Sequence, residues 1–398
     1  MRKLLKYIGI NKLGFLELIV AMYPILMGYQ YGSIPCTLLF LIIMDILAIF
    51  RPKRGAIPSK LMKWLTAFVI VHEVILCVTM RNLPSYHINS IVSLVIVMVS
   101  IFIITPRVEY EKLVSSINLV AVICMAGIVY HFALLQMGQY ITPIKVPFMP
   151  DLNSASRLYN EVRRPCSFFW EPQSYCTFMS VPLFLSLVDK KYTWASTIIL
   201  SMFLSTSTTG IAISILSLIV FVVTQDVSRY QRFFVVVIGA ALIVFLFTSD
   251  YFSSGVQKME NTSYETSSRL YNGPTFIANM EKSDLILGIN NSNVYDYYRE
   301  GHVDAFLMEK YDTIFMPSFW NALAKFGLLG IILFLGVYLE PLKDYRQLMI
   351  FVIPLIVALF TNPDFLGGLF SFEFIIIYSY MINFKKNENL YSYHTVCE

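Results

Sequence analysis

The feature that most constrains this chain is a succession of apolar runs, most of them about 17–23 residues long, that fills almost all of it. An α-helix of that length crosses roughly 30 Å of hydrocarbon and satisfies its own backbone hydrogen bonds. Because 57% of the residues are apolar and only 14% are charged, the composition is far from that of a soluble domain. The pattern predicts an all-α polytopic integral membrane protein. The runs are 13–29, 33–50, 64–80, 88–106, 113–135, 171–188, 192–206, 209–225, 233–249, 317–339, 347–361 and 369–384.

The number of spans depends on two short runs, 192–206 and 209–225, which only Ser207 and Thr208 separate. They could form one long broken helix, but the charge distribution favours two helices and therefore twelve transmembrane spans. With an even number, both termini lie in the cytoplasm, and most of the 30 Lys and Arg residues then fall in short cytoplasmic loops, as the positive-inside rule requires. The first run lacks a small-residue cleavage site, which predicts a retained helix rather than a signal peptide.

Two longer polar intervals interrupt the spans, and the extramembrane chemistry is expected there. The net charge of +4 is explained by cytoplasmic orientation signals, so it does not indicate a nucleic-acid partner. The expected organisation is transmembrane helices one to five in 1–135, a first extracytoplasmic loop at 136–170, helices six to nine in 171–249, a large extracytoplasmic loop at 250–316, helices ten to twelve in 317–384 and a cytoplasmic tail at 385–398.

The first loop ends in charged residues at the membrane boundary, where Arg163 and Arg164 are followed by Glu171 and Pro172. Proline suits the first turn of a helix, and a carboxylate beside it favours the positive helix N-terminus. One interpretation is therefore structural, with Glu171 starting a helix and pairing with an arginine. The other gives the arginines to an anionic ligand and leaves Glu171 to orient or deprotonate a hydroxyl group.

The large loop is rich in tyrosine, with arginine, histidine and aspartate interspersed. This composition is common where proteins contact sugars, and it is also common near any membrane interface. A sharper feature is the segment 266–271, followed by 284–290, in which Gly288 is expected to form a turn after a short apolar stretch. Earlier in the chain, the Ser/Thr run 205–209 is expected to bond backbone groups where two helices turn, with Gly210 permitting close packing.

The order of these elements resembles that of the Wzy-type O-antigen and capsular polysaccharide repeat-unit polymerases, in a superfamily that also contains the O-antigen ligases. The ligases resemble one another in a His-Asn pair upstream of the glycine that corresponds to Gly327, where this chain has Met316 and Pro317. That departure favours a polymerase over a ligase. The segments that carry the resemblance are 163–172, the Ser/Thr-Gly break 205–210, the Ser-Arg element and Leu-Gly turn within 268–288, and 319–330.

The resemblance implies a GT-C-like glycosyltransferase fold with one large and one medium extracytoplasmic loop. It implies transfer of a growing glycan from one polyprenyl diphosphate to the sugar of a second lipid-linked repeat unit, on the outer face of the bacterial cytoplasmic membrane. Neither a metal nor another cofactor is implied. The implied partners are polyprenyl-diphosphate-linked oligosaccharides, the lipid bilayer, a chain-length regulator and a flippase.

The same resemblance suggests roles for individual residues. Negative charge develops on the departing diphosphate, so guanidinium groups that bind it more strongly in the transition state lower the barrier. Arg163, Arg164 and Arg269 are expected in that role, with Glu171 as the base or as a sugar-orienting acid. Candidates for contact with the substrate are Tyr271, His302 and Lys325.

Polar groups within the apolar runs also have structural interpretations. The pair His72-Glu73 would suit a proton relay in a transporter, but interior pairing is preferred because no other span supplies a matching series of acids. Glu17 and Asp45 are likewise expected to face the bundle interior, whereas Lys325 could also reach a diphosphate from a cavity wall.

Two further observations stay open at this point. His302 could substitute for the ligase histidine if the large loop folds back, but a surface histidine is the preferred interpretation. The six cysteines include no C-x-x-C pair, which predicts neither a disulfide framework nor a zinc site, although Cys166 and Cys176 could meet near the outer face.

Four functions compete for this sequence. A glycan polymerase explains the large loop, the arginine-bearing loop and the number of spans. A lipid-linked oligosaccharide flippase or another transporter would show two similar halves, short loops and a charged central cavity, whereas this chain has a lopsided loop distribution. A scaffold or receptor would use the loops as a docking surface and would not need the Arg-Glu cluster, and an O-antigen ligase would lack its His-Asn pair.

Overall fold

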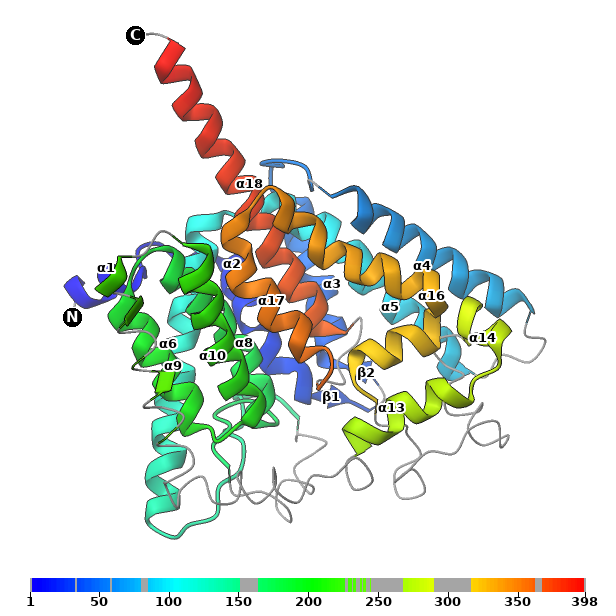
Figure 1. Cartoon of the computed structure of the whole chain (residues 1–398), viewed down its shortest axis with the longest axis horizontal. Coiled ribbons are helices and arrows are strands. Elements are labelled where there is room, and N and C mark those ends of the chain that lie inside the picture. The colour runs from blue at the N-terminus through cyan, green and yellow to red at the C-terminus, as the bar shows by residue number, and fades with distance from the viewer. Residues whose placement is uncertain are drawn as a thin grey trace.

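The computed structural model describes residues 2–32, 34–57, 59–79, 85–150, 164–225, 268–289, 316–361 and 367–396, with a few short pieces between 228 and 244. For 76–79, 85–90, 268–270 and 386–396, only the backbone is described. Most of these residues are helical, and their sheet is a two-stranded hairpin (Figure 1). The predicted all-α class is therefore confirmed for the described part of the chain.

Each predicted apolar run except 233–249 coincides with a helix, and that run lies mostly outside the described residues. The hairpin between the first two runs was not predicted. The first half of the chain contains α1 (Arg2–Ile8), α2 (Phe15–Met22), η1 (Tyr23–Gly28), β1 (Gln30–Tyr31), β2 (Ile34–Pro35), α3 (Cys36–Ile49), α4 (Lys60–Thr79), α5 (Ser85–Ile104), η2 (Thr105–Arg107) and α6 (Tyr110–Gln136). The second half contains α8 (Pro172–Val188), α9 (Tyr192–Leu204), α10 (Thr208–Thr224), α13 (Ser268–Asn279), α14 (Lys282–Leu287), α16 (Ser318–Leu339), η4 (Glu340–Lys343), η5 (Arg346–Leu348), α17 (Met349–Ala358) and α18 (Gly368–Val396).

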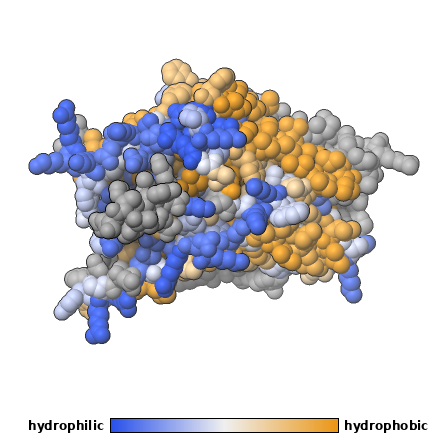
Figure 2. All heavy atoms as spheres, turned by 90° about the horizontal axis from the view of Figure 1, so that it is seen from above, coloured by the Kyte–Doolittle hydropathy of each residue, from blue (hydrophilic) through white to orange (hydrophobic). Residues whose placement is uncertain are grey.

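Several surfaces of the molecule are apolar. Among the described residues, two helical segments, Tyr110–Gln136 and Ser318–Lys343, are long and apolar enough to cross a membrane by length and composition. Large apolar side chains such as Ile46 and Trp64 are exposed on α3 and α4. Figure 2 shows hydrophobic residues covering much of one side of the molecule. Because large apolar patches are rare on soluble monomers, these features indicate association with a membrane.

Charged side chains within the apolar helices are paired. Arg51 lies 2.6 Å from the fully buried carboxylate of Glu17, and Ser100 Oγ donates to Asp45 at 2.7 Å. A buried charge is costly unless it is paired and hydrogen-bonded, so these contacts explain how the two acids are accommodated. Glu17 therefore faces the bundle interior as predicted, and Asp45 is half-buried with a hydroxyl group as its partner.

Contacts between helix ends gather in two places along the bundle. At the first, which we call the Glu340 end, Lys60 N donates to Glu340 Oε1 at 3.2 Å and Arg54 pairs with Glu109 at 2.8 Å. Ser59 Oγ also donates to Glu340. These contacts join the starts of α4 and α6 to the end of α16.

The opposite group of contacts, which we call the Ser167 end, joins other helix termini. Ile144 N donates to Ser167 O at 2.8 Å, and Val146 N donates to the Tyr29 hydroxyl group at 2.8 Å. These bonds hold the segments after α6 and η1 against the segment before α8. Among the described connections, those before α4 and α6 therefore lie at the Glu340 end, and those after η1 and α6 lie at the Ser167 end.

Candidate functional site

The segment that carries Arg164 and Glu171, residues 164–171, is here called the arginine loop. It is held by α6 through a buried histidine: His131 Nδ1 accepts hydrogen bonds from Cys166 N at 3.3 Å and from Ser167 N at 3.2 Å. One turn earlier on α6, Gly127 lies directly beneath the Ser167 side chain, where a Cβ would clash. The end of α6 therefore fixes the backbone of the loop.

Arg164 and Glu171 share the surroundings of one thiol. The pKa of Cys166 is raised to about 12, mainly by burial, with Glu171 also raising it and Arg164 lowering it. A cation and an anion, each half-buried, thus act on a thiol that stays neutral. Cys166 and Cys176 are both free in the structure, so no disulfide joins them.

Glu171 stands immediately before α8. Its backbone is extended (φ −152°, ψ 157°), and Pro172 is the first helical residue, which confirms the predicted helix start. The Glu171 side chain does not cap the helix, and Ser174 Oγ lies 3.5 Å from its Oε1. The carboxylate therefore lies at the helix N-terminus but does not accept a capping hydrogen bond from the backbone of α8.

The Ser/Thr run forms a break between two separate helices, as predicted. Thr206 adopts a left-handed conformation (φ 54°), and Ser207 Oγ caps α10 by accepting a hydrogen bond from Gly210 N at 3.2 Å. Ser205 Oγ donates to Met202 O at 2.6 Å. The run therefore satisfies backbone groups at the turn, and the alternative of one long broken helix is wrong.

The α9–α10 break lies against the start of α8. Cys176 Sγ is 3.1 Å from Ser205 Oγ, and a Cβ on Gly210 would clash with the Cys176 side chain. Arg164 acts electrostatically on Cys176 as well. The structure thus brings together the first two segments of the resemblance, which α8 and α9 separate in the sequence.

A second junction joins α13 and α14 to α16. Gly288, which ends α14 (φ 82°), lies against Gly327 (φ 65°). A Cβ on Gly288 would be 2.7 Å from Gly327 N, and a Cβ on Gly327 would be 2.8 Å from Gly288 N. No other residue fits these distances and these φ values. The predicted turn at Gly288 is confirmed, and the third and fourth segments of the resemblance meet at this glycine junction.

The glycine junction breaks α16, which was predicted as one uninterrupted helix from 317 to 339. Gly327 has non-helical angles (φ 65°, ψ −167°), and α16 changes direction there (Figure 1). A carbonyl group freed by the break is satisfied, because Ile289 N donates to Ala324 O at 3.0 Å. The sequence predicts a span here but not this break, which depends on a contact with a distant segment.

Three charged or titratable residues surround the glycine junction. His72 Nε2 lies 2.7 Å from Leu287 O, so it donates to the carbonyl group at the end of α14. The neighbouring Glu73 is fully buried, and it acts electrostatically on Lys325. His72 Nδ1 also lies 3.8 Å from Glu73 Oε1, so the interior pairing predicted for His72-Glu73 is confirmed.

The α9–α10 break and the start of α16 lie at the Ser167 end. Helices α10 and α17 pack closely, and Arg346, just before α17, donates to Val223 O near the end of α10 at 3.4 Å. The two helices therefore run antiparallel, which puts the start of α10 beside the end of α17. There Phe319 N, at the start of α16, donates to Leu359 O at 3.0 Å.

Some predicted site residues lie outside this description. Arg163 and His302 fall outside the described residues, and Arg269 is described only as backbone within α13. Tyr271 is half-buried in the same helix, and α13 is fixed because the Trp320 ring occupies the space above Gly273. No group of three or more His, Cys, Asp or Glu side chains in the described part of the chain could hold a metal ion.

His131 is a site residue that sequence reasoning missed. It is 1% exposed and orients the arginine loop, yet a single histidine in an apolar helix has no pattern of its own. The available signal is its spacing from Gly127: residues four apart share one helix face, and a small residue beside a polar one marks a place where another segment packs closely.

Replacing His131 with alanine is expected to destabilise the protein by about 1–3 kcal/mol, because two buried N–H groups of the arginine loop lose their acceptor. Thermal unfolding of the detergent-purified protein measures this loss. The matched control is Tyr130→Ala, which removes a neighbouring side chain that is 55% exposed. Equal stability of the two variants would show that His131 does not hold the loop.

No protein-family model, curated protein or solved structure matches the chain. The interpretation of the two junctions rests on their geometry and chemistry.

Proposed function

We propose that the protein is a multi-pass glycosyltransferase of the bacterial cytoplasmic membrane that polymerises glycan repeat units carried on polyprenyl diphosphate. It acts on the outer face of the membrane, which is the Ser167 end, with both termini in the cytoplasm. The product belongs to an O-antigen, a capsule or an exopolysaccharide.

The observation that carries this proposal is the pairing of the four segments that resemble the polymerases. Segments 164–172 and 205–210 lie together, and so do 268–288 and 319–330, although each pair is separated in the sequence. The first pair lies at the Ser167 end, where segment 319–330 also begins. Segments that serve one reaction must converge in this way, because catalysis depends on holding the reacting groups in a fixed geometry.

The contacts between helix ends support the proposed multi-pass topology. Arg54, Lys60 and Arg346 all lie at the Glu340 end, where the sequence places cytoplasmic loops. The described connections at the Ser167 end carry few cations, as the positive-inside rule expects of an outer face.

The chemistry assigned to the site follows from its charges. An acceptor hydroxyl oxygen attacks the anomeric carbon of the donor sugar, and the bond from that carbon to the diphosphate oxygen breaks. Arg164, with Arg163 and Arg269, stabilises the negative charge on the leaving diphosphate. Glu171 accepts the hydroxyl proton or orients the sugar. Tyr271, His302 and Lys325 are assigned to substrate binding.

One observation favours a second candidate, a transporter of lipid-linked oligosaccharides. Transporters commonly bind their cargo at discontinuous helices, and α16 is discontinuous at Gly327 beside the Glu73 and Lys325 charges. The polymerase remains the first candidate because α14 packs against the break in α16, and the freed backbone groups named above are already hydrogen-bonded.

Deleting the gene in its bacterial host and separating the surface polysaccharide by size tests the proposed function. A polymerase predicts single repeat units where long chains were present, with long chains restored by the wild-type gene. Complete loss of surface glycan, with lipid-linked units trapped inside, would identify the transporter instead. An unchanged ladder of chain lengths would contradict both functions.

A further inference from the structure

The N-terminal segment 2–15 combines exposed cations with exposed apolar side chains. Arg2, Lys3, Lys6 and Lys12 are all exposed, and no acidic residue occurs before Glu17. Interleaved with them, large apolar side chains point outward: Leu4 is 60% exposed, Tyr7 44%, Leu13 49% and Phe15 68%.

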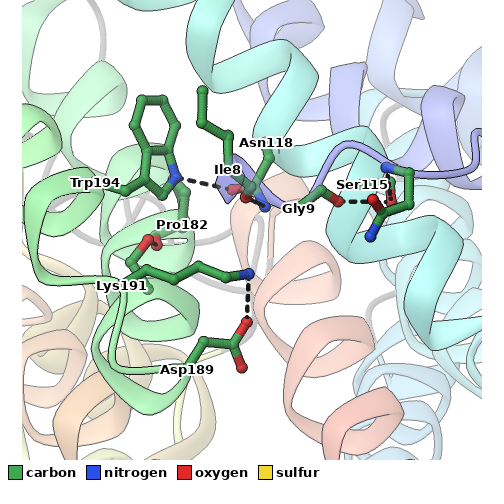
Figure 3. A network of polar contacts seen from close by, with 10 residues as sticks. Ile8, Gly9, Ser115, Asn118, Pro182, Asp189, Lys191 and Trp194 are labelled. Carbon is green, nitrogen blue, oxygen red and sulfur yellow. Dashed lines mark hydrogen bonds and ion pairs between the residues drawn. The ribbon is translucent and has the colours of Figure 1, made fainter. Parts of the chain in front are cut away.

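This segment is attached to the bundle at the turn after α1, although most of its side chains are exposed. Figure 3 shows buried polar side chains of α6 that form hydrogen bonds with the turn after α1. Asn118 Nδ2 donates to Ile8 O at 2.8 Å, and Ser115 Oγ donates to Gly9 O at 2.9 Å. Asn118 is itself oriented by Trp194 Nε1, which donates to its Oδ1 at 3.3 Å. The position of α1 is therefore fixed by these contacts with α6, although the helix itself is short.

The anchor places α1 at the bundle end that holds the positive connections. Ser115 and Asn118 lie in the first turns of α6, near the Arg54–Glu109 pair of the Glu340 end. The connection between α8 and α9 is also close, since a Cβ on Gly9 would lie 3.1 Å from Lys191 Nζ. Lys191 pairs with Asp189 at 2.8 Å, so the acidic group of that connection is already neutralised.

We propose that α1 and the adjoining residues to Phe15 form a docking surface for anionic phospholipid headgroups of the cytoplasmic leaflet. Cations that alternate with apolar side chains are typical of segments that lie in the plane of the interface, where the apolar groups enter the lipid and the cations bind phosphate. Charge complementarity selects the occupant, because the segment offers four cations and no anion.

This inference rests on the proposed embedding in a membrane but not on glycosyl transfer. Loss of lipid selectivity would leave the polysaccharide test untouched, and failure of that test would leave the lipid selectivity in place. Each experiment can therefore contradict its own proposal, the docking surface or the glycosyltransferase, without affecting the other.

Native mass spectrometry of the full chain in a non-ionic detergent tests the docking surface, with phosphatidylglycerol and phosphatidylcholine of the same acyl composition as probes. The wild-type protein should prefer phosphatidylglycerol. The variant with Arg2→Gln, Lys3→Gln and Lys6→Gln should bind phosphatidylglycerol at least about tenfold more weakly at low salt. The reason is that each cation near an anionic surface raises the binding constant severalfold.

The matched control removes three exposed cations at the same end, one before α4 and two in its first turn, with Lys53→Gln, Lys60→Gln and Lys63→Gln. It should retain the affinity of the wild-type protein for phosphatidylglycerol. Equal weakening in both variants would show general charge attraction and overturn α1 as the docking surface. If the α1 variant bound phosphatidylglycerol as tightly as the wild-type protein, α1 would not be the docking surface. That conclusion would hold even if the variant no longer co-purified with another protein, which would indicate a protein partner instead.

Discussion

Replacing Gly327 with alanine is expected to lower the free energy of unfolding by about 2–6 kcal/mol. Two costs add: a backbone conformation that only glycine adopts readily, and a Cβ forced against the main chain of Ile286 and Gly288, each on the order of 1–3 kcal/mol. The described cysteines Cys36, Cys124, Cys166 and Cys176 are buried, so reaction with a thiol-specific dye during heating reports unfolding.

A glycine in the same helix provides the control for this experiment. A Cβ on Gly336 would lie 3.1 Å from Cδ1 of Leu61, the end of a flexible side chain, so Gly336→Ala should unfold close to the wild-type temperature. Gly288→Ala should resemble Gly327→Ala, because it belongs to the same junction. If Gly327→Ala proved as stable as Gly336→Ala, the glycine junction would not hold α14 on α16.

Removing Arg164 or Arg269 is expected to reduce chain extension by about 10²–10³, the usual effect of removing one oriented group that stabilises developing charge. Arg164→Lys and Arg269→Lys should recover little, because an ammonium group cannot bind a diphosphate through two parallel hydrogen bonds. The measurement is the size distribution of surface glycan in a deletion strain that carries each variant.

The control for the arginine variants is Arg229→Ala, which removes an exposed guanidinium group from the segment after α10. It should support full-length glycan. Immunoblots of the membrane fraction must show equal amounts of each protein. Long glycan in the Arg269→Ala strain would remove Arg269 from the mechanism, and the same result for Arg164→Ala would leave the arginine loop with a structural role.

The helices could be predicted because each depends on its own residues. A long apolar run in a membrane satisfies its backbone internally, whatever its neighbours do. The break between α9 and α10 was also predictable, since Ser207 supplies the cap locally. The boundaries were less accurate: α4 begins at Lys60 rather than 64, because lysine is a good helix former that an apolar pattern does not count.

Features that depend on distant contacts could not be predicted. The sequence around Gly327 is apolar and helix-compatible, and the break there arises from Gly288 on another segment. His131 gains its role from backbone N–H groups of the arginine loop, and Lys325 lies close enough to Glu73 on α4 to feel its charge. Each of these depends on which segments become neighbours, and hydropathy carries no information about that.

The glycine junction is a connection between main-chain atoms. Gly288 and Gly327 have no side chains, and the bond that completes the junction runs from Ile289 N to Ala324 O. One side chain adds to this connection, because His72 donates to Leu287 O, whereas the exposed side chains of α14 are not needed for it. The side chains of Ile286 and Leu287 are mostly exposed, so they can be substituted while α14 stays attached to α16. The outer surface of this segment is therefore free to vary in sequence without loss of the helical framework.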